Sequence, residues 1–124
     1  WVAVLLPARN PGVSPWASLM ACAYPILEVL FSIVRRRHRN LHPGHPDRLH
    51  LHSLIQNRVA RKQLPNWPAV LKNAAVSPMV WGFSAFPALL AVLAAHSTSL
   101  LVASFVFCGF LYVRLYRRLI RFSW

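Results

Sequence analysis

The chain has 124 residues, which is the usual size of a single domain. Hydrophobic residues make up 56% of it and charged residues only 13%, well below the roughly 25% charged content that is typical of soluble domains. The formal charge is nevertheless +12, because 14 Lys and Arg accompany only two acidic residues, Glu28 and Asp47. A basic excess can indicate nucleic-acid binding. Here the cations are clustered between long uncharged stretches, so we exclude nucleic acid as a partner and predict an all-α, polytopic membrane protein.

The N-terminal residues predict a helix that begins upstream of the chain. Trp1 opens directly into an apolar run that ends at Leu6, and no positively charged segment precedes it, which argues against a secretory signal peptide. We therefore expect residues 1–124 to be the C-terminal part of a single, larger membrane domain, with 2–6 as the end of a fourth helix. Residues 7–15, with their prolines and one Gly, form a turn-rich connector.

Three further stretches are apolar enough to be membrane spans, at about 17–34, 78–95 and 99–113. A spanning helix needs ~20 mostly apolar residues. The third stretch is therefore short unless Tyr112, Tyr116 and a snorkelling Arg114 extend it into the interface. The second and third spans are joined by a tight polar hairpin, in which we interpret His96 as an ordinary loop residue.

The positions of the cations predict the orientation of these spans. All of the 14 Lys and Arg except Arg9 lie in the long loop 35–77 or in the tail 114–124. Cytoplasmic segments of membrane proteins are enriched in Lys and Arg, so we predict that this loop and the C-terminus face the cytoplasm. The three spans then alternate across the membrane without conflict.

The long loop is predicted to contain one amphipathic helix. Prolines in 42–46 exclude a helix there, and Asp47 is well placed to act as the N-cap of a helix from 48 to about 63. The apolar side of this helix is formed by Leu51, Leu54, Ile55 and Val59.

The same loop holds the densest group of chemically active side chains, in residues 42–52. A metal site is disfavoured, because no thiolate is near and His50 and His52 would point about 200° apart on a helix. An anion site fits better, since Arg48 and these histidines surround a helix N-terminus that favours phosphate. The third interpretation is a solvated loop next to the membrane, with the arginines of 35–39 held by anionic lipid headgroups.

Two segments resemble a known enzyme family. Residues 46–55, Pro-Asp-Arg-Leu-His-Leu-His-Ser-Leu-Ile, are similar to the last cytoplasmic His motif of the polyprenyl-phosphate N-acetylhexosamine-1-phosphate transferases. Residues 24–32, Tyr-Pro-Ile-Leu-Glu-Val-Leu-Phe-Ser, resemble the helix that leads into that motif. This is glycosyltransferase family 4, related to the phospho-N-acetylmuramoyl-pentapeptide transferases. The resemblance covers about 14–59, and Ser53 stands where some members have another His.

The resemblance implies a phosphoglycosyl transferase in the bacterial inner (cytoplasmic) membrane. It would transfer N-acetylhexosamine-1-phosphate from a UDP-N-acetylhexosamine to undecaprenyl phosphate and release UMP, initiating a cell-surface glycan such as O-antigen in lipopolysaccharide biosynthesis. Membrane lipids are further partners. No residue of this segment is expected to be a catalytic nucleophile. The residues expected to bind the UDP-sugar diphosphate are His50, His52, Arg48 and Asp47, and the accessory residues are His45, Arg35, Arg36 and Glu28.

The family requires Mg²⁺, which neutralises the diphosphate. With only two acidic residues, this segment lacks the family's acid-rich motifs, so we expect the Mg²⁺ ligands upstream of Trp1 and expect the segment alone to be inactive. Glu28 lies within a predicted span, where a carboxylate is costly, and we interpret it as facing the bundle interior and pairing with a Tyr, Ser or Arg of a helix outside the segment. Two alternatives remain: a non-catalytic membrane protein whose basic loop binds anionic lipid or a partner, and a metal transporter.

Overall fold

The computed structural model describes residues 2–38, 40, 49–60, 62 and 64–121. No strand occurs among these residues, and the predicted all-α fold is confirmed. Two of the helices, α6 and α7, are long and apolar enough to cross a membrane. The elements in chain order are α1 (Val2–Arg9), α2 (Pro15–Ala21), α3 (Ala23–His38), α4 (Leu51–Ile55), the π-helix η1 (Gln56–Ala60), α6 (Ala69–Leu93) and α7 (Thr98–Arg121).

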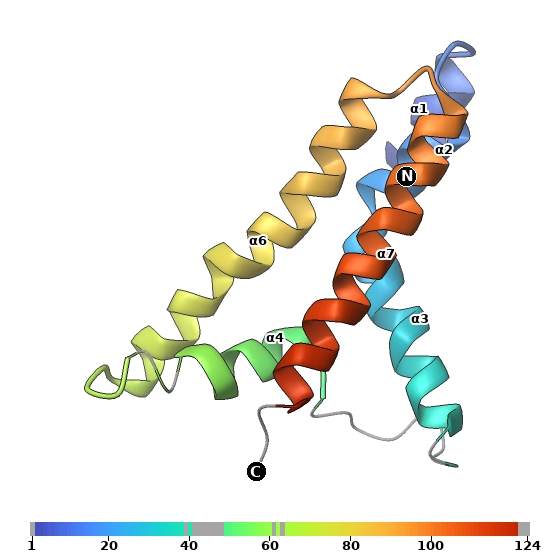
Figure 1. Ribbon diagram of the computed structural model, residues 1–124. Coiled ribbons are helices and arrows are strands. Elements are labelled where there is room, and N and C mark those ends of the chain that lie inside the picture. Colours follow the sequence, from blue (N-terminus) through green and yellow to red (C-terminus); the bar gives the residue numbers. More distant parts are fainter. Residues whose placement is uncertain (1, 39, 41–48, 61, 63, 122–124) are drawn as a thin grey trace.

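The helices form an open arrangement with a narrow and a wide end (Figure 1). Helices α6 and α7 meet at a short turn and diverge from it, while α1 and α2 lie beside the start of α7. Helix α3 continues toward the wide end, and α4 with η1 lies across that end between α6 and α7. The short connections therefore lie at one end of the molecule and the basic helix ends at the other. Spans that cross a membrane in alternating directions, as predicted from the sequence, would need the basic helix ends on one side and the short connections on the other.

The first predicted span, 17–34, is broken in the structure into α2 and α3, which meet at an angle of 73°. Proline has no N–H to donate, and its ring clashes with the carbonyl four residues earlier. For Pro25 that carbonyl belongs to Ala21, the last residue of α2. The chain turns at Cys22, and α3 begins at the next residue. A local proline signal therefore explains the bend.

The other two spans are longer than the apolar stretches predicted. Helix α6 begins at Ala69, directly after Pro68, whose carbonyl accepts a hydrogen bond from the Lys72 amide at 3.0 Å. Part of the segment assigned to the loop 35–77 is therefore helical and continuous with the second span. Helix α6 also passes through Pro78 and Pro87, as membrane helices tolerate. Helix α7 runs on to Arg121, so 114–121 extends the third helix instead of forming a separate tail.

The amphipathic helix of the loop is shorter than predicted and changes its winding. It begins at Leu51, with His50 at the N-cap position, and continues from Gln56 as a π-helix; Asp47, the predicted N-cap, lies outside the described residues. Its predicted apolar side is nevertheless the side that packs inward. Leu51, Leu54 and Ile55 are buried in a cluster with residues of α6 and α7, and Val59 packs against that cluster.

Polar contacts join the two connections at the narrow end. The Ser14 amide donates to the Ala95 carbonyl at 2.9 Å, and the Ser14 hydroxyl lies 2.8 Å from that of Thr98. His96 donates from Nδ1 to the Gly12 carbonyl at 2.7 Å. His96 is thus a loop residue, as interpreted from the sequence, and it also ties the turn between α6 and α7 to the start of α2.

Candidate functional site

The carboxylate of Glu28 is the centre of a polar cluster at the wide end of the helices. Its side chain is 13% exposed. Oε1 accepts a hydrogen bond from the Leu51 amide at 2.9 Å and lies 2.9 Å from Nδ1 of His50. Oε2 accepts from the Tyr112 hydroxyl at 2.9 Å. One side chain of α3 therefore binds the start of α4 and the middle of α7.

These contacts determine which ring nitrogen of His50 carries a proton. Oε1 of Glu28 accepts a hydrogen bond from the Leu51 amide and Oε2 accepts one from the Tyr112 hydroxyl, so both oxygens already serve as acceptors. Nδ1 of His50 is then the donor to Oε1, an assignment that follows from the hydrogen-bond network. Nε2 is the nitrogen that remains for another partner.

Glu28 also replaces the missing cap of α4. His50 occupies the N-cap position but makes no capping hydrogen bond with its side chain. The first amide of the helix, that of Leu51, is satisfied by the carboxylate of Glu28 instead. The first N–H groups of a helix lack partners within the helix, and a negative charge there is favourable. The position of the His motif thus depends on a carboxylate from another helix.

The partners of Glu28 differ from those expected from the sequence. We predicted that it faces the interior and pairs with a helix outside the segment. It does face the interior, but its partners are Tyr112, His50 and Leu51 of the same chain. Tyr112 and Tyr116 were predicted only as interfacial residues. Their spacing of one helical turn on α7 is the signal that could have identified a hydroxyl-bearing face toward α3.

Arg35 holds the chain one residue before His50. It donates to the Leu49 carbonyl at 2.9 Å and to Ser32 at 3.1 Å, and it also donates to the Tyr116 hydroxyl. Its guanidinium carbon lies 5.4 Å from the centre of the Tyr116 ring. Arg35 was predicted as an accessory substrate residue, and the structure places it as an internal contact of the loop. Arg36 follows it and is half-buried.

His52 lies beside His50 on the exposed side of the cluster. The two rings are nearly parallel, with an angle of 8° and centres 5.7 Å apart. A continuous helix would have turned them away from each other, but His50 has an extended backbone with ψ of 149°. His52 also lines a shallow pocket of about 270 Å³ together with Gln56 and Asn73. The two histidines are thus brought together, while Asp47, Arg48 and His45 lie outside the described residues.

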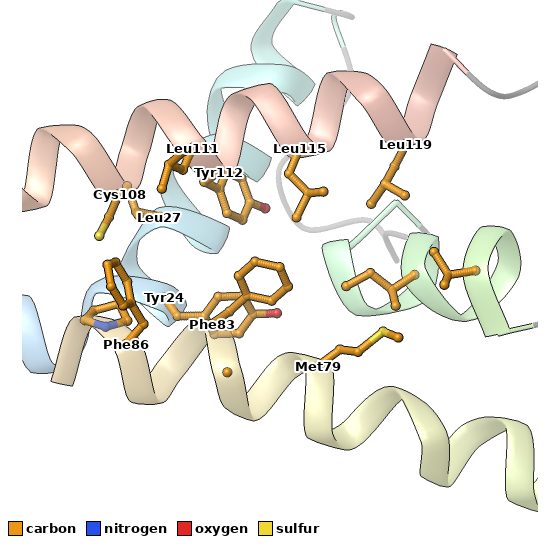
Figure 2. Close-up of a pocket in the computed structure, with 14 residues that line it drawn as sticks. Tyr24, Leu27, Met79, Phe83, Phe86, Cys108, Leu111, Tyr112, Leu115 and Leu119 are labelled. Carbon is orange, nitrogen blue, oxygen red and sulfur yellow. The ribbon is translucent and has the colours of Figure 1, made fainter. Parts of the chain in front are cut away.

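An apolar cavity of about 470 Å³ borders this cluster. It lies between α3, α6 and α7, and α4 with η1 closes part of it. Figure 2 shows Leu115 and Leu119 pointing from α7 toward the side occupied by Met79 and Phe83 of α6. Tyr112 lies in its wall and donates to Glu28, so the apolar cavity and the polar cluster share a boundary. The volume is within the ~300–1,000 Å³ of small-molecule sites.

The described residues do not fit a Mg²⁺ site. Mg²⁺ prefers several oxygen ligands in an octahedral arrangement, but both oxygens of Glu28 already accept hydrogen bonds from the chain itself. No group of three or more His, Cys, Asp or Glu among the described residues is placed to hold a metal ion. His50 and His52 form only a pair.

We compared the chain with known protein families, curated proteins and solved structures. The chain matches no known protein family, no curated protein and no solved structure.

Proposed function

We propose that the chain is the C-terminal part of a phosphoglycosyl transferase of the bacterial inner membrane. The reaction transfers N-acetylhexosamine-1-phosphate from a UDP-sugar to undecaprenyl phosphate, as the first step of a cell-surface glycan. A phosphate oxygen of the lipid attacks the sugar-bearing phosphorus, and UMP leaves. The observation that supports this proposal most strongly is the His50–His52 pair, held by Glu28 at the boundary of an apolar cavity.

This arrangement suits a reaction between a polar donor and a lipid acceptor. The phosphate of a polyprenyl lipid is polar, whereas its chain is apolar, so its site needs both kinds of surface side by side. The cavity between α6 and α7 is lined by aliphatic and aromatic side chains, which suit the isoprenoid units nearest the lipid phosphate. Tyr112 marks the point where that surface gives way to the polar cluster.

In this proposal the histidines bind the diphosphate of the UDP-sugar and do not attack it. Nε2 of His50 is directed away from its bond to Glu28, and in the protonated ring it donates to a phosphate oxygen. His52 is exposed beside it and adds a second ring. Asp47 and Arg48 complete the predicted diphosphate contacts. The loop and the C-terminus face the cytoplasm, where UDP-sugars are found. The Mg²⁺ that the resemblance implies would neutralise charge on the diphosphate, and its ligands would be acidic residues outside this segment.

The test is UMP release from UDP-N-acetylglucosamine and undecaprenyl phosphate by the full-length protein in membranes. His52→Ala and Arg48→Ala are expected to lower the rate at least ~10-fold, because each removes a donor to the diphosphate, and donors of this kind contribute ~10²–10³ in comparable sites. His96→Ala is the matched control, since it removes the same side chain at the opposite end of the molecule. If turnover is unchanged in both site variants while the protein inserts normally, the site assignment is wrong.

The alternative is a non-catalytic membrane protein whose basic loop binds anionic lipid or a partner. An exposed cation at the wide end, Arg37, favours some lipid contact there. Arg35 does not contribute to such a surface, because it is directed into the protein. UMP release above the level of membranes without the protein distinguishes the two functions.

A further inference from the structure

Four arginines form a stripe along the C-terminal part of α7. Arg114, Arg117, Arg118 and Arg121 follow one another at spacings of three, one and three residues. Residues three, four and seven positions apart lie on one side of a helix. All four side chains are exposed, and together with Phe110 and Val113 they line a groove of about 800 Å³. We call these four residues the arginine stripe.

The arginine stripe continues an exposed apolar face of the same helix. Val106, Phe107 and Phe110 are 66%, 51% and 60% exposed. Because α7 is long and apolar enough to cross a membrane, side chains on such a face meet acyl chains. Arg114 follows Phe110 by one turn, a rise of ~6 Å. The arginine stripe therefore lies at the depth where acyl chains give way to headgroups.

The protein itself supplies no negative charge to this stripe within the described residues. Glu28 is directed inward and is shared by three donors. None of the four guanidinium groups makes a hydrogen bond, ion pair or ring contact in the described part of the chain. Four cations within two helical turns repel one another unless an anion lies among them.

We propose that the arginine stripe is a binding site for the headgroup phosphate of an anionic phospholipid. Guanidinium groups bind phosphate oxygens in pairs, with two parallel hydrogen bonds. The apolar side of the groove, formed by Phe110 and Val113, fits the start of an acyl chain and offers nothing to a soluble polyanion. The site is distinct from the His50–His52 cluster, and it does not depend on the proposed enzymatic function.

The test is titration of the detergent-purified protein with phosphatidylglycerol, followed by native mass spectrometry. We expect saturable binding that phosphatidylcholine does not reproduce. The variant with Arg114, Arg117, Arg118 and Arg121 all changed to Gln is expected to bind at least ~10-fold more weakly, since each basic residue at an anionic surface contributes ~1 kcal/mol. The matched control changes Arg9, Arg58, Lys62 and Lys72 to Gln, which removes the same charge from positions outside the arginine stripe, and we expect it to retain binding.

Three results would overturn the proposal. An equal loss in the two charge-matched variants would mean that only the overall positive field attracts lipid. Displacement of the lipid by an equimolar amount of water-soluble glycerol phosphate would mean that the site recognises free phosphate. Retention of full binding by Arg117→Gln/Arg121→Gln would show that the stripe is not the site. This double variant is the safer one for folding, and circular dichroism provides the check on helix content.

Discussion

Replacing Glu28 by Ala removes one acceptor group that two other helical elements share. The carboxylate of α3 accepts from the Leu51 amide at the start of α4, from Tyr112 of α7 and from His50. Without it these donors face a site that is largely closed to water, since the Glu28 side chain is only 13% exposed. We therefore expect the variant to loosen the start of α4 and to lower the stability of the whole wide end.

The size of this effect can be worked from the contacts. A hydrogen bond to a charged group contributes about 1.5–3 kcal/mol. The bonds from Leu51 and Tyr112 fall in this range, whereas the His50 side chain is 35% exposed and its contact is weakened by solvent screening. We expect Glu28→Ala to cost about 4 kcal/mol of unfolding free energy and Tyr112→Phe about 2 kcal/mol. In the Glu28→Ala background, Tyr112→Phe should cost almost nothing, because the bond is already gone.

Two measurements on the protein in detergent micelles check this prediction. Denaturant or thermal unfolding of the four proteins gives the coupling between Glu28 and Tyr112, and hydrogen exchange across 51–55 reports on the start of α4. Val29→Ala is the control, because Val29 is on the same helix but 56% exposed. The reasoning is refuted if Glu28→Ala is no more destabilising than Val29→Ala, or if the Leu51 amide remains as protected as before.

Two further predictions concern the cavity and the narrow end. Leu115→Trp should fill the cavity and raise the KM for undecaprenyl phosphate several-fold more than that for the UDP-sugar, measured as UMP release, whereas Val106→Trp on the exposed face of α7 should change neither. An equal rise in the KM for both substrates would show that the cavity does not bind undecaprenyl phosphate specifically. Ser14→Ala should cost about 1 kcal/mol of unfolding free energy, because Ser14 is a buried N-cap that also contacts Thr98. A loss that is just as large in a Thr98→Val background would show that the two hydroxyls do not interact.

Much of the fold could be predicted because its signals are local. Long apolar stretches indicated α6 and α7, and the spacing of Leu51, Leu54 and Ile55 indicated the buried side of α4. Periodicity of this kind arises from the geometry of one helix and requires no knowledge of its neighbours. Helix ends were less predictable, because apolar composition marks the part of a helix that fits a membrane and says little about how far the helix continues into water.

The candidate site depended on tertiary structure. The sequence singled out His50, His52, Glu28 and Arg35, but it could not name the internal partners of Glu28 and Arg35. Glu28 and Tyr112 are 84 positions apart, and no spacing rule connects residues on different helices.

The Pro25 bend between α2 and α3, and the crossing of α4 beneath α7, bring these side chains together. Composition and periodicity thus determined which helices form and which face of each is apolar, because those properties belong to single helices. Only the packing of the helices decided which polar groups meet inside, because a buried carboxylate such as that of Glu28 is satisfied by the donors that neighbouring helices place within hydrogen-bond distance.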